Sequence, residues 1–188
     1  PGDLFFEMRF GHSGGSPTSG GMVGRARGGA GCSTSSIPNL HNYSGKQKVH
    51  NGLDIYAALN TDIFAMYDGT VQTMVSTVPA NTEGNAGSFG NKVRLRHTPA
   101  QYGGATGDDD IYTYYTHLNA VENIAVGDAI TQGQKLGETG RTGNAIDIAA
   151  WRYHSHINVY VGGTARADVV DPRPYLFTQF DLNGGTTN

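Results

Sequence analysis

The sequence predicts a mainly β fold in which an antiparallel sheet forms the core, long loops form a groove, and helices are few. Of its 188 residues, 28 are glycine and 10 are tyrosine, a composition that favours strands joined by many turns. Val71, Thr73 and Val75 alternate with Gln72, Met74 and Ser76, and Val93 and Leu95 alternate with Lys92, Arg94 and Arg96. This alternation is typical of antiparallel strands that bury one face.

Short β-type segments follow one another along the chain, beginning with a strand near Leu4–Phe10. The Asp68-Gly69 step predicts a hairpin turn between two of the later strands. Two stretches rich in Gly, Asn and Asp, Pro79–Asn91 and Thr98–Asp110, predict long loops of the kind that often form binding walls. The other predicted strands are Leu53–Ala57, Ile63–Met66, Thr70–Val78, Lys92–Arg96, Ile111–Thr116 and Ser155–Val161.

The length predicts a single domain over residues 1–188, which is enough chain to bury a sizeable core. About residues 11–36 are dominated by Gly and Ser without an apolar period, so we expect a long loop there. A proline-containing tail is predicted at about residues 170–188. The sequence begins at Pro1 without a signal segment, which predicts a mature or trimmed fragment.

Charge and composition exclude several classes of partner. The balance of 13 Lys and Arg against 16 Asp and Glu gives a formal charge of −3, so we expect no nucleic acid and no anionic membrane as partner. The apolar runs are shorter than the roughly 20 residues that span a bilayer, and we expect a soluble monomer. Cys32 is the only cysteine, and its Gly/Ser-rich surroundings favour a loop residue over a nucleophile.

Two histidines separated by one residue, His154 and His156, provide the first indication of a functional site. Side chains two apart on a strand project to the same face, about 6 to 7 Å apart at Cα. His50 and Asp54 flank Asn51-Gly52, a turn-prone step that can direct both side chains to one point. His50, Asp54 and His156 would then supply the donors of an open three-ligand zinc site whose fourth position holds water.

Each of these patterns is ambiguous by itself, because exposed strands also carry paired histidines without function. They become specific when they occur in one small β domain together with Tyr115-Thr116-His117-Leu118. A hydrolytic zinc site needs a group that takes a proton from the water, and the chain contains no His-Glu-x-x-His motif to supply it. His117 and His154 remain as candidates, since imidazole has a pKa near neutral pH.

These motifs resemble those of the lysostaphin and LytM type of zinc metallopeptidases, the β-lytic endopeptidases of bacterial cell walls. The resemblance runs from about Phe10 to Leu176. The central matches are His50-Asn51-Gly52-Leu53-Asp54-Ile55, Tyr115-Thr116-His117-Leu118 and His154-Ser155-His156. Supporting matches are Phe10-Gly11, Gly45-Lys46, Asp68-Gly69-Thr70-Val71, Val126-Gly127-Asp128, Gly133-Gln134, Gly137-Glu138-Thr139-Gly140, and Pro172-x-Pro174-Tyr175-Leu176.

The resemblance implies a site composed of metal ligands and a pair of histidines. His50, Asp54 and His156 would bind one zinc ion. His117 and His154 would match the catalytic histidines of the family. We favour His154 as the base, with His117 orienting the water or stabilising the oxyanion, and the sequence leaves the order of these roles open.

The same resemblance implies hydrolysis of peptide bonds in peptidoglycan stem peptides or cross-bridges, or in other Gly-rich peptides. It also implies a secreted or cell-envelope location, in the periplasm or at the cell surface. One alternative is a catalytically inactive or regulatory cell-wall-binding module of the same fold, although each ligand and catalytic position is filled. Another is a cupin-like metal oxygenase, but Asn158 and Tyr160 stand where that fold places a glutamate after its His-x-His pair.

The chain departs from the family pattern at Asn144–Tyr153, which is longer than usual and ends in Tyr153 in place of a proline. Trp151, Tyr153 and Tyr43 are candidates for groove contacts, although aromatic residues more often belong to a core. Three further histidines, His12, His41 and His97, lie outside these motifs. His97 ends a predicted strand and suggests a surface or turn position, whereas His41 is a candidate inhibitory ligand of an unactivated form.

Overall fold

In the computed structural model of the chain, residues 52–84, 89–147 and 153–170 are described, together with Pro172 and Tyr175. Elsewhere the structure describes only the backbone of short strands. These are β1 (Phe5–Met8), β2 (Ser13–Gly14), β3 (Gly24–Arg25), β4 (Asn42–Tyr43), β5 (Lys46–Gln47), β16 (Gln179–Phe180) and β17 (Thr186–Thr187). Several residues of the sequence analysis therefore lie outside the described residues, namely His12, Cys32, His41, His50, Trp151 and the side chain of Tyr43.

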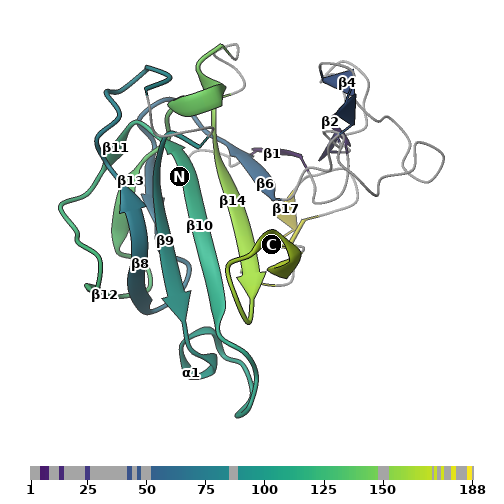
Figure 1. Ribbon diagram of the computed structural model, residues 1–188, viewed down its shortest axis with the longest axis vertical. Coiled ribbons are helices and arrows are strands. Elements are labelled where there is room, and N and C mark those ends of the chain that lie inside the picture. Colours follow the sequence, from purple (N-terminus) through teal and green to yellow (C-terminus); the bar gives the residue numbers. More distant parts are fainter. Residues whose placement is uncertain are drawn as a thin grey trace.

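The large sheet contains eight strands in the order β1-β6-β14-β10-β9-β8-β12, with β15 also paired to β14. Every pairing in it is antiparallel. Figure 1 shows β8, β9, β10 and β14 side by side. Their bounds and those of the flanking strands are β6 (Leu53–Tyr56), β8 (Gly69–Val75), β9 (Asn91–His97), β10 (Ile111–Leu118), β12 (Ala129–Ile130), β14 (His154–Val161) and β15 (Val169–Val170).

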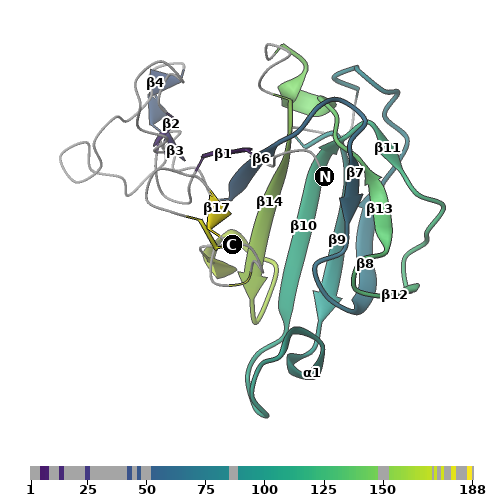
Figure 2. The same ribbon diagram turned by 180° about the vertical axis from the view of Figure 1, so that it is seen from behind.

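A second sheet of three strands, in the order β11-β13-β7, covers one face of the large sheet. In Figure 2, which views the molecule from behind, β7 and β13 lie in front of the large sheet. The bounds are β7 (Asp62–Phe64), β11 (Ala120–Val121) and β13 (Lys135–Glu138). The apolar core between the sheets contains Ala65, Val71, Val93, Leu95, Tyr115, Leu118, Ile130, Leu136 and Ile157.

Helices are short among the described residues: α1 (Pro99–Tyr102), with the 3-10 turns Gly143–Ala145 and Arg166–Asp168. The backbone N–H of Thr98 donates to the Gln101 side chain at 2.8 Å at the start of α1. Gly103 ends it in the left-handed conformation with φ of 79°. None of the described helices has the length and apolar character needed to cross a bilayer.

The structure confirms the predicted fold class but differs from the prediction in two segments. Strands β7 and β8 belong to different sheets, so the predicted hairpin at Asp68-Gly69 is wrong, and the step joins the two layers instead. The predicted loop Thr98–Asp110 contains α1. The pairing of β11 with β13 was not predicted, because strands of two to four residues are too short for alternation to be detected.

His97 is fully buried at the end of β9, so the predicted surface or turn position is wrong. Its Nδ1 lies 2.6 Å from the Asp68 carbonyl oxygen and its Nε2 lies 2.8 Å from Thr113 Oγ1. A carbonyl only accepts, so Nδ1 carries the proton and Nε2 accepts from the threonine hydroxyl. Gly69 is required beside it, because a Cβ atom there would lie 2.5 Å from His97 Nδ1.

We expect His97 to make the fold sensitive to acid. Burial lowers its pKa below the ordinary value of 6.5. The unfolded chain therefore binds a proton below pH 6.5 that the folded chain does not, and stability falls as pH decreases through that value. His97→Gln should reduce the stability lost between pH 7.5 and 5.5 by about 1 kcal/mol. Urea unfolding at both pH values measures the difference, and equal losses in the two proteins would contradict the assignment.

Candidate active site

Strand β14 places the two predicted site histidines by pairing with β6 on one side and β10 on the other. His156 stands opposite Asp54 of β6 and opposite Thr116 of β10. His154 projects from the same face two residues earlier. As a result, Asp54 Oδ1 lies 2.7 Å from His156 Nδ1 and 3.6 Å from His154 Nε2. Three of the predicted site residues thus converge on the face of the sheet opposite the apolar core.

His117 joins them through a β-bulge. Strict alternation along β10 would direct His117 to the core face with Tyr115, but the register shifts between Thr116 and Leu118. The backbone of His117 adopts a φ of 62°, which is unusual for a residue other than glycine. Its ring centroid then lies 5.3 Å from that of His154, while Leu118 returns to the core.

The surroundings of His117 fix its protonation. Nδ1 lies 2.9 Å from the Thr142 carbonyl oxygen, so Nδ1 carries the proton and donates it. Burial, followed by the neighbouring His154 and His156, lowers the pKa of His117 to about 3. The ring is therefore neutral, and its Nε2 carries a lone pair. In this form His117 can accept a hydrogen bond through Nε2 but cannot donate one from it.

Thr142 connects His117 to the neighbouring loop. Its hydroxyl donates to the Leu118 carbonyl at 2.9 Å and accepts the backbone N–H of Asn91 at 3.0 Å. Gly90 packs so closely that an added Cβ would overlap the Thr142 side chain, and its φ is 58°. No motif in the sequence points to Thr142, because its role depends on contacts between segments far apart in the chain.

Phe89 borders the site from the loop between β8 and β9. Its ring stacks at 22° on His156 with centroids 5.8 Å apart, and lies 5.7 Å from the ring of Tyr114. The Phe89 carbonyl also accepts the backbone N–H of the bulged His117 at 3.0 Å. The sequence predicted that this loop forms a wall but did not single out Phe89.

The described donors fit a zinc ion. Asp54 and His156 are only 2% and 5% exposed, and they present an oxygen and a nitrogen to each other. Zinc binds such atoms at about 2.0 to 2.2 Å, which separates tetrahedral ligands by about 3.3 to 3.5 Å. The observed 2.7 Å needs to widen by only a fraction of an ångström. Carboxylate and imidazole are also the donor types that zinc prefers.

The third predicted ligand, His50, lies outside the described residues. Within the described ranges, no group of three or more His, Cys, Asp or Glu side chains is arranged to hold a metal. The ligand set of His50, Asp54 and His156 therefore stays a prediction. So do the catalytic roles of His117 and His154, whose proximity the structure records.

Comparison with known proteins gives the family. The sequence model of peptidase family M23 matches residues 48–170, a span that includes Asp54, His117, His154 and His156. The chain belongs to peptidase family M23. This M23 peptidase is therefore a hydrolase of the peptidase class, which agrees with the motifs that the sequence presented.

The solved structure of LytU shows the same fold. LytU is 24% identical with a TM-score of 0.51, over 72% of this chain and 77% of that chain. The catalytic domain of lysostaphin from Staphylococcus simulans is 25% identical with a TM-score of 0.49, over 73% of this chain and 85% of that one. The matched region spans 43% of a longer lysostaphin chain. A zinc-containing peptidase from Vibrio cholerae is 23% identical with a TM-score of 0.48, over 70% and 32% of the two chains.

The insert that departs from the family pattern is described at its two ends. Residues 143–145 form a 3-10 turn, and residues 148–152 lie outside the described residues. Tyr153 is half-buried, with the Arg141 guanidinium 5.7 Å from its ring centroid. Contact of Tyr153 with substrate stays a prediction.

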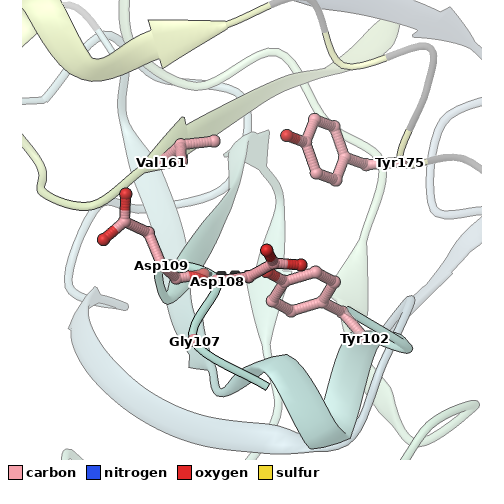
Figure 3. Close-up of a pocket in the computed structure, with 6 residues that line it drawn as sticks. All are labelled: Tyr102, Gly107, Asp108, Asp109, Val161 and Tyr175. Carbon is pink, nitrogen blue, oxygen red and sulfur yellow. Dashed lines mark hydrogen bonds between the residues drawn. The ribbon is translucent and has the colours of Figure 1, made fainter. Parts of the chain in front are cut away.

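A hollow at the other end of the sheet is separate from this site. It is lined by Tyr102, Gly107, Asp108, Asp109, Val161 and Tyr175 (Figure 3). Val161 ends β14 whereas His154 begins it, a separation of about 23 Å along the strand. Two polar side chains of this hollow form hydrogen bonds within local turns: Asp108 accepts the Ala105 N–H at 2.7 Å, and Tyr102 donates to the Asp109 carbonyl at 2.8 Å.

Gly52 is the residue whose replacement should disturb the site most directly through packing. A Cβ atom there would overlap the Ile157 carbonyl oxygen and lie 2.7 Å from His156 Nε2. Gly52→Ala should therefore force β6 and β14 apart and cost about 1 to 3 kcal/mol of stability. Urea unfolding measures this, with the exposed substitution Ser76→Ala as control, expected to stay within about 0.5 kcal/mol. An unchanged midpoint in Gly52→Ala would show that the strands accommodate the methyl group.

Proposed function

We propose that this M23 peptidase is a zinc-dependent endopeptidase that hydrolyses peptide bonds in peptidoglycan stem peptides or cross-bridges. The observation that carries the proposal is the convergence of Asp54, His117, His154 and His156 in one buried cluster. Buried ionisable groups without a function are costly, so a cluster of this kind favours a reaction centre. Membership of a peptidase family supports peptide bonds as the substrate.

Asp54 and His156 would hold the zinc ion, with His50 as the third ligand. When bound, zinc lowers the pKa of a coordinated water toward neutrality and polarises the scissile carbonyl. Asp54 supplies the negative charge that favours a cation at this buried position. Thr116 donates its hydroxyl hydrogen to the His156 carbonyl at 3.0 Å, and this hydrogen bond helps to hold β14 in register with β10.

His117 and His154 would divide the proton handling between them. The Nε2 lone pair of His117 can accept a hydrogen bond from the attacking water and orient it, and this supports the water-orienting role over oxyanion stabilisation. His154 would accept the proton of that water and return it to the leaving amine. The resulting groove would take an extended peptide along β14 and β10.

The substrate sets the expected location. Peptidoglycan lies outside the cytoplasmic membrane, so the proposal places the mature chain in the cell envelope or outside the cell, acting as a monomer.

His156→Ala should abolish zinc retention and hydrolysis together, because it removes a ligand that faces Asp54. Elemental analysis of the purified variant measures the zinc, and His97→Gln, which changes a buried histidine outside the site, provides the matched control at pH 7.5. Full zinc occupancy in His156→Ala would overturn the ligand assignment.

His154→Ala should retain zinc while kcat falls about 10²- to 10⁴-fold, the range expected for loss of a general base. The assay is mass spectrometry of fragments released from purified peptidoglycans with different cross-bridges. Near-normal hydrolysis by the variant would move the base role to another residue. Binding of the wild-type, zinc-loaded protein to these peptidoglycans without release of fragments would instead support the inactive binding module.

A further inference from the structure

Arg94 of β9 lies between two tyrosine rings on the same face of the sheet as the site. Its guanidinium carbon is 4.5 Å from the centroid of Tyr114 and 5.2 Å from that of Tyr160. Both tyrosines are more than 90% buried. The ring of Phe89 contacts both Tyr114 and His156, so the arginine and the histidines belong to one continuous surface.

The charge of Arg94 is not balanced locally. Among the described residues Arg94 forms no ion pair with a carboxylate. Its side chain hydrogen-bonds to Tyr114 and Tyr160, and Nη1 makes a long hydrogen bond of 3.5 Å to Gln72 Oε1. Its Nε is buried and has no hydrogen-bond partner there. By contrast Arg96, two residues along the same strand, is paired with Asp110 at 2.5 Å. A half-buried guanidinium in this state is poised for an anion.

The sheet register gives the position of Arg94 relative to the site. Arg94, Tyr114 and Asn158 stand opposite one another across three strands, and Lys92, Thr116 and His156 form the next row. Arg94 and His156 are thus one row apart, about 7 Å, and two strands apart, about 10 Å, which separates their backbones by about 12 Å. Burial, followed by the charge of Arg94, lowers the pKa of Lys92, which stands in the same row as His156.

We propose that Arg94, held between Tyr114 and Tyr160, binds a carboxylate of the peptide substrate about three to four residues from the scissile bond. This inference rests on the proposed endopeptidase function and adds a substrate class to it: peptides that carry a free carboxylate at that distance. An extended peptide advances about 3.3 to 3.6 Å per residue, so a separation of about 12 Å corresponds to three to four residues. A planar guanidinium fixed by two rings presents its fork in the geometry that carboxylates bind.

The test compares matched peptides. Glycine-rich peptides that differ only by Glu or Gln, scanned over five positions on each side of the cleaved bond, are assayed with the zinc-loaded protein. A second pair with a free or amidated C-terminus separates a side-chain carboxylate from a terminal one. The wild type should prefer the acid at one position by about tenfold or more in kcat/KM. Arg94→Gln should lose that preference while it cleaves the amide peptide as the wild type does.

Arg96→Gln is the matched control, because it removes the same charge from the same face of the same strand and should keep the preference. Arg94→Lys retains an aliphatic stem between the rings but lacks the planar fork, so it should also lose most of the preference for the acid. This variant replaces Arg94→Gln in the test if Arg94→Gln does not fold. Equal kcat/KM for acid and amide in the wild type, or an undiminished preference in both Arg94 variants, overturns the subsite.

Binding separates failure of the subsite from failure of the proposed function. If no peptide is cleaved, the endopeptidase proposal fails, and calorimetry with the same peptide pairs still tests Arg94. Tighter binding of the acid peptide to the wild type than to Arg94→Gln supports the subsite. Equal binding of acid and amide peptides to the wild type overturns it.

Discussion

The pairing of β14 between β6 and β10 is the constraint on which the site depends. It brings Asp54, Thr116 and His156 into one row, although these residues come from three segments of the chain. The opposite face of the same strands contributes Tyr115 and Ile157 to the apolar core. The core therefore fixes the register, and a shift by one residue would turn the site residues into the core. The stability of the sheet and the geometry of the site have the same origin.

The bulge at His117 shows how the fold adds a fourth group that alternation alone would exclude. A left-handed backbone at a non-glycine residue costs about 1 to 3 kcal/mol, so it persists only where the surroundings hold it. Here the Phe89 carbonyl binds the backbone of His117 and the Thr142 carbonyl binds its ring. Thr142 in turn binds Asn91, at the end of the loop that carries Phe89. The strain at His117 is thus offset by a network that also places the wall of the site.

Period-two reasoning predicted that His154 and His156 share a face, because both lie on a regular strand where side-chain direction follows from residue number. Asp54 was included through the turn-prone step before it, and its place opposite His156 follows from the pairing of β6 with β14. The sequence could identify His117 only through its motif, since the alternation of β10 assigns that position to the core. The sequence did not predict the roles of Phe89, Thr142 and Arg94, because each acts through contacts with segments far away in the chain. His97 was misjudged for a related reason: its partners, the Asp68 carbonyl and the Thr113 hydroxyl, make burial of a polar ring acceptable.

Net charge and local charge lead to different conclusions about partners. The formal charge of −3 argues against long polyanions, because their binding depends on many phosphate contacts over a wide surface. Recognition of a single carboxylate needs only one guanidinium in a partly desolvated position, where charges are screened less than in water. Arg96 is neutralised by Asp110 on the exposed part of the sheet, whereas Arg94, nearer to His156, lacks such a partner among the described residues. The positive potential is therefore concentrated beside the histidines, where it can select among peptides without giving the whole molecule a basic surface.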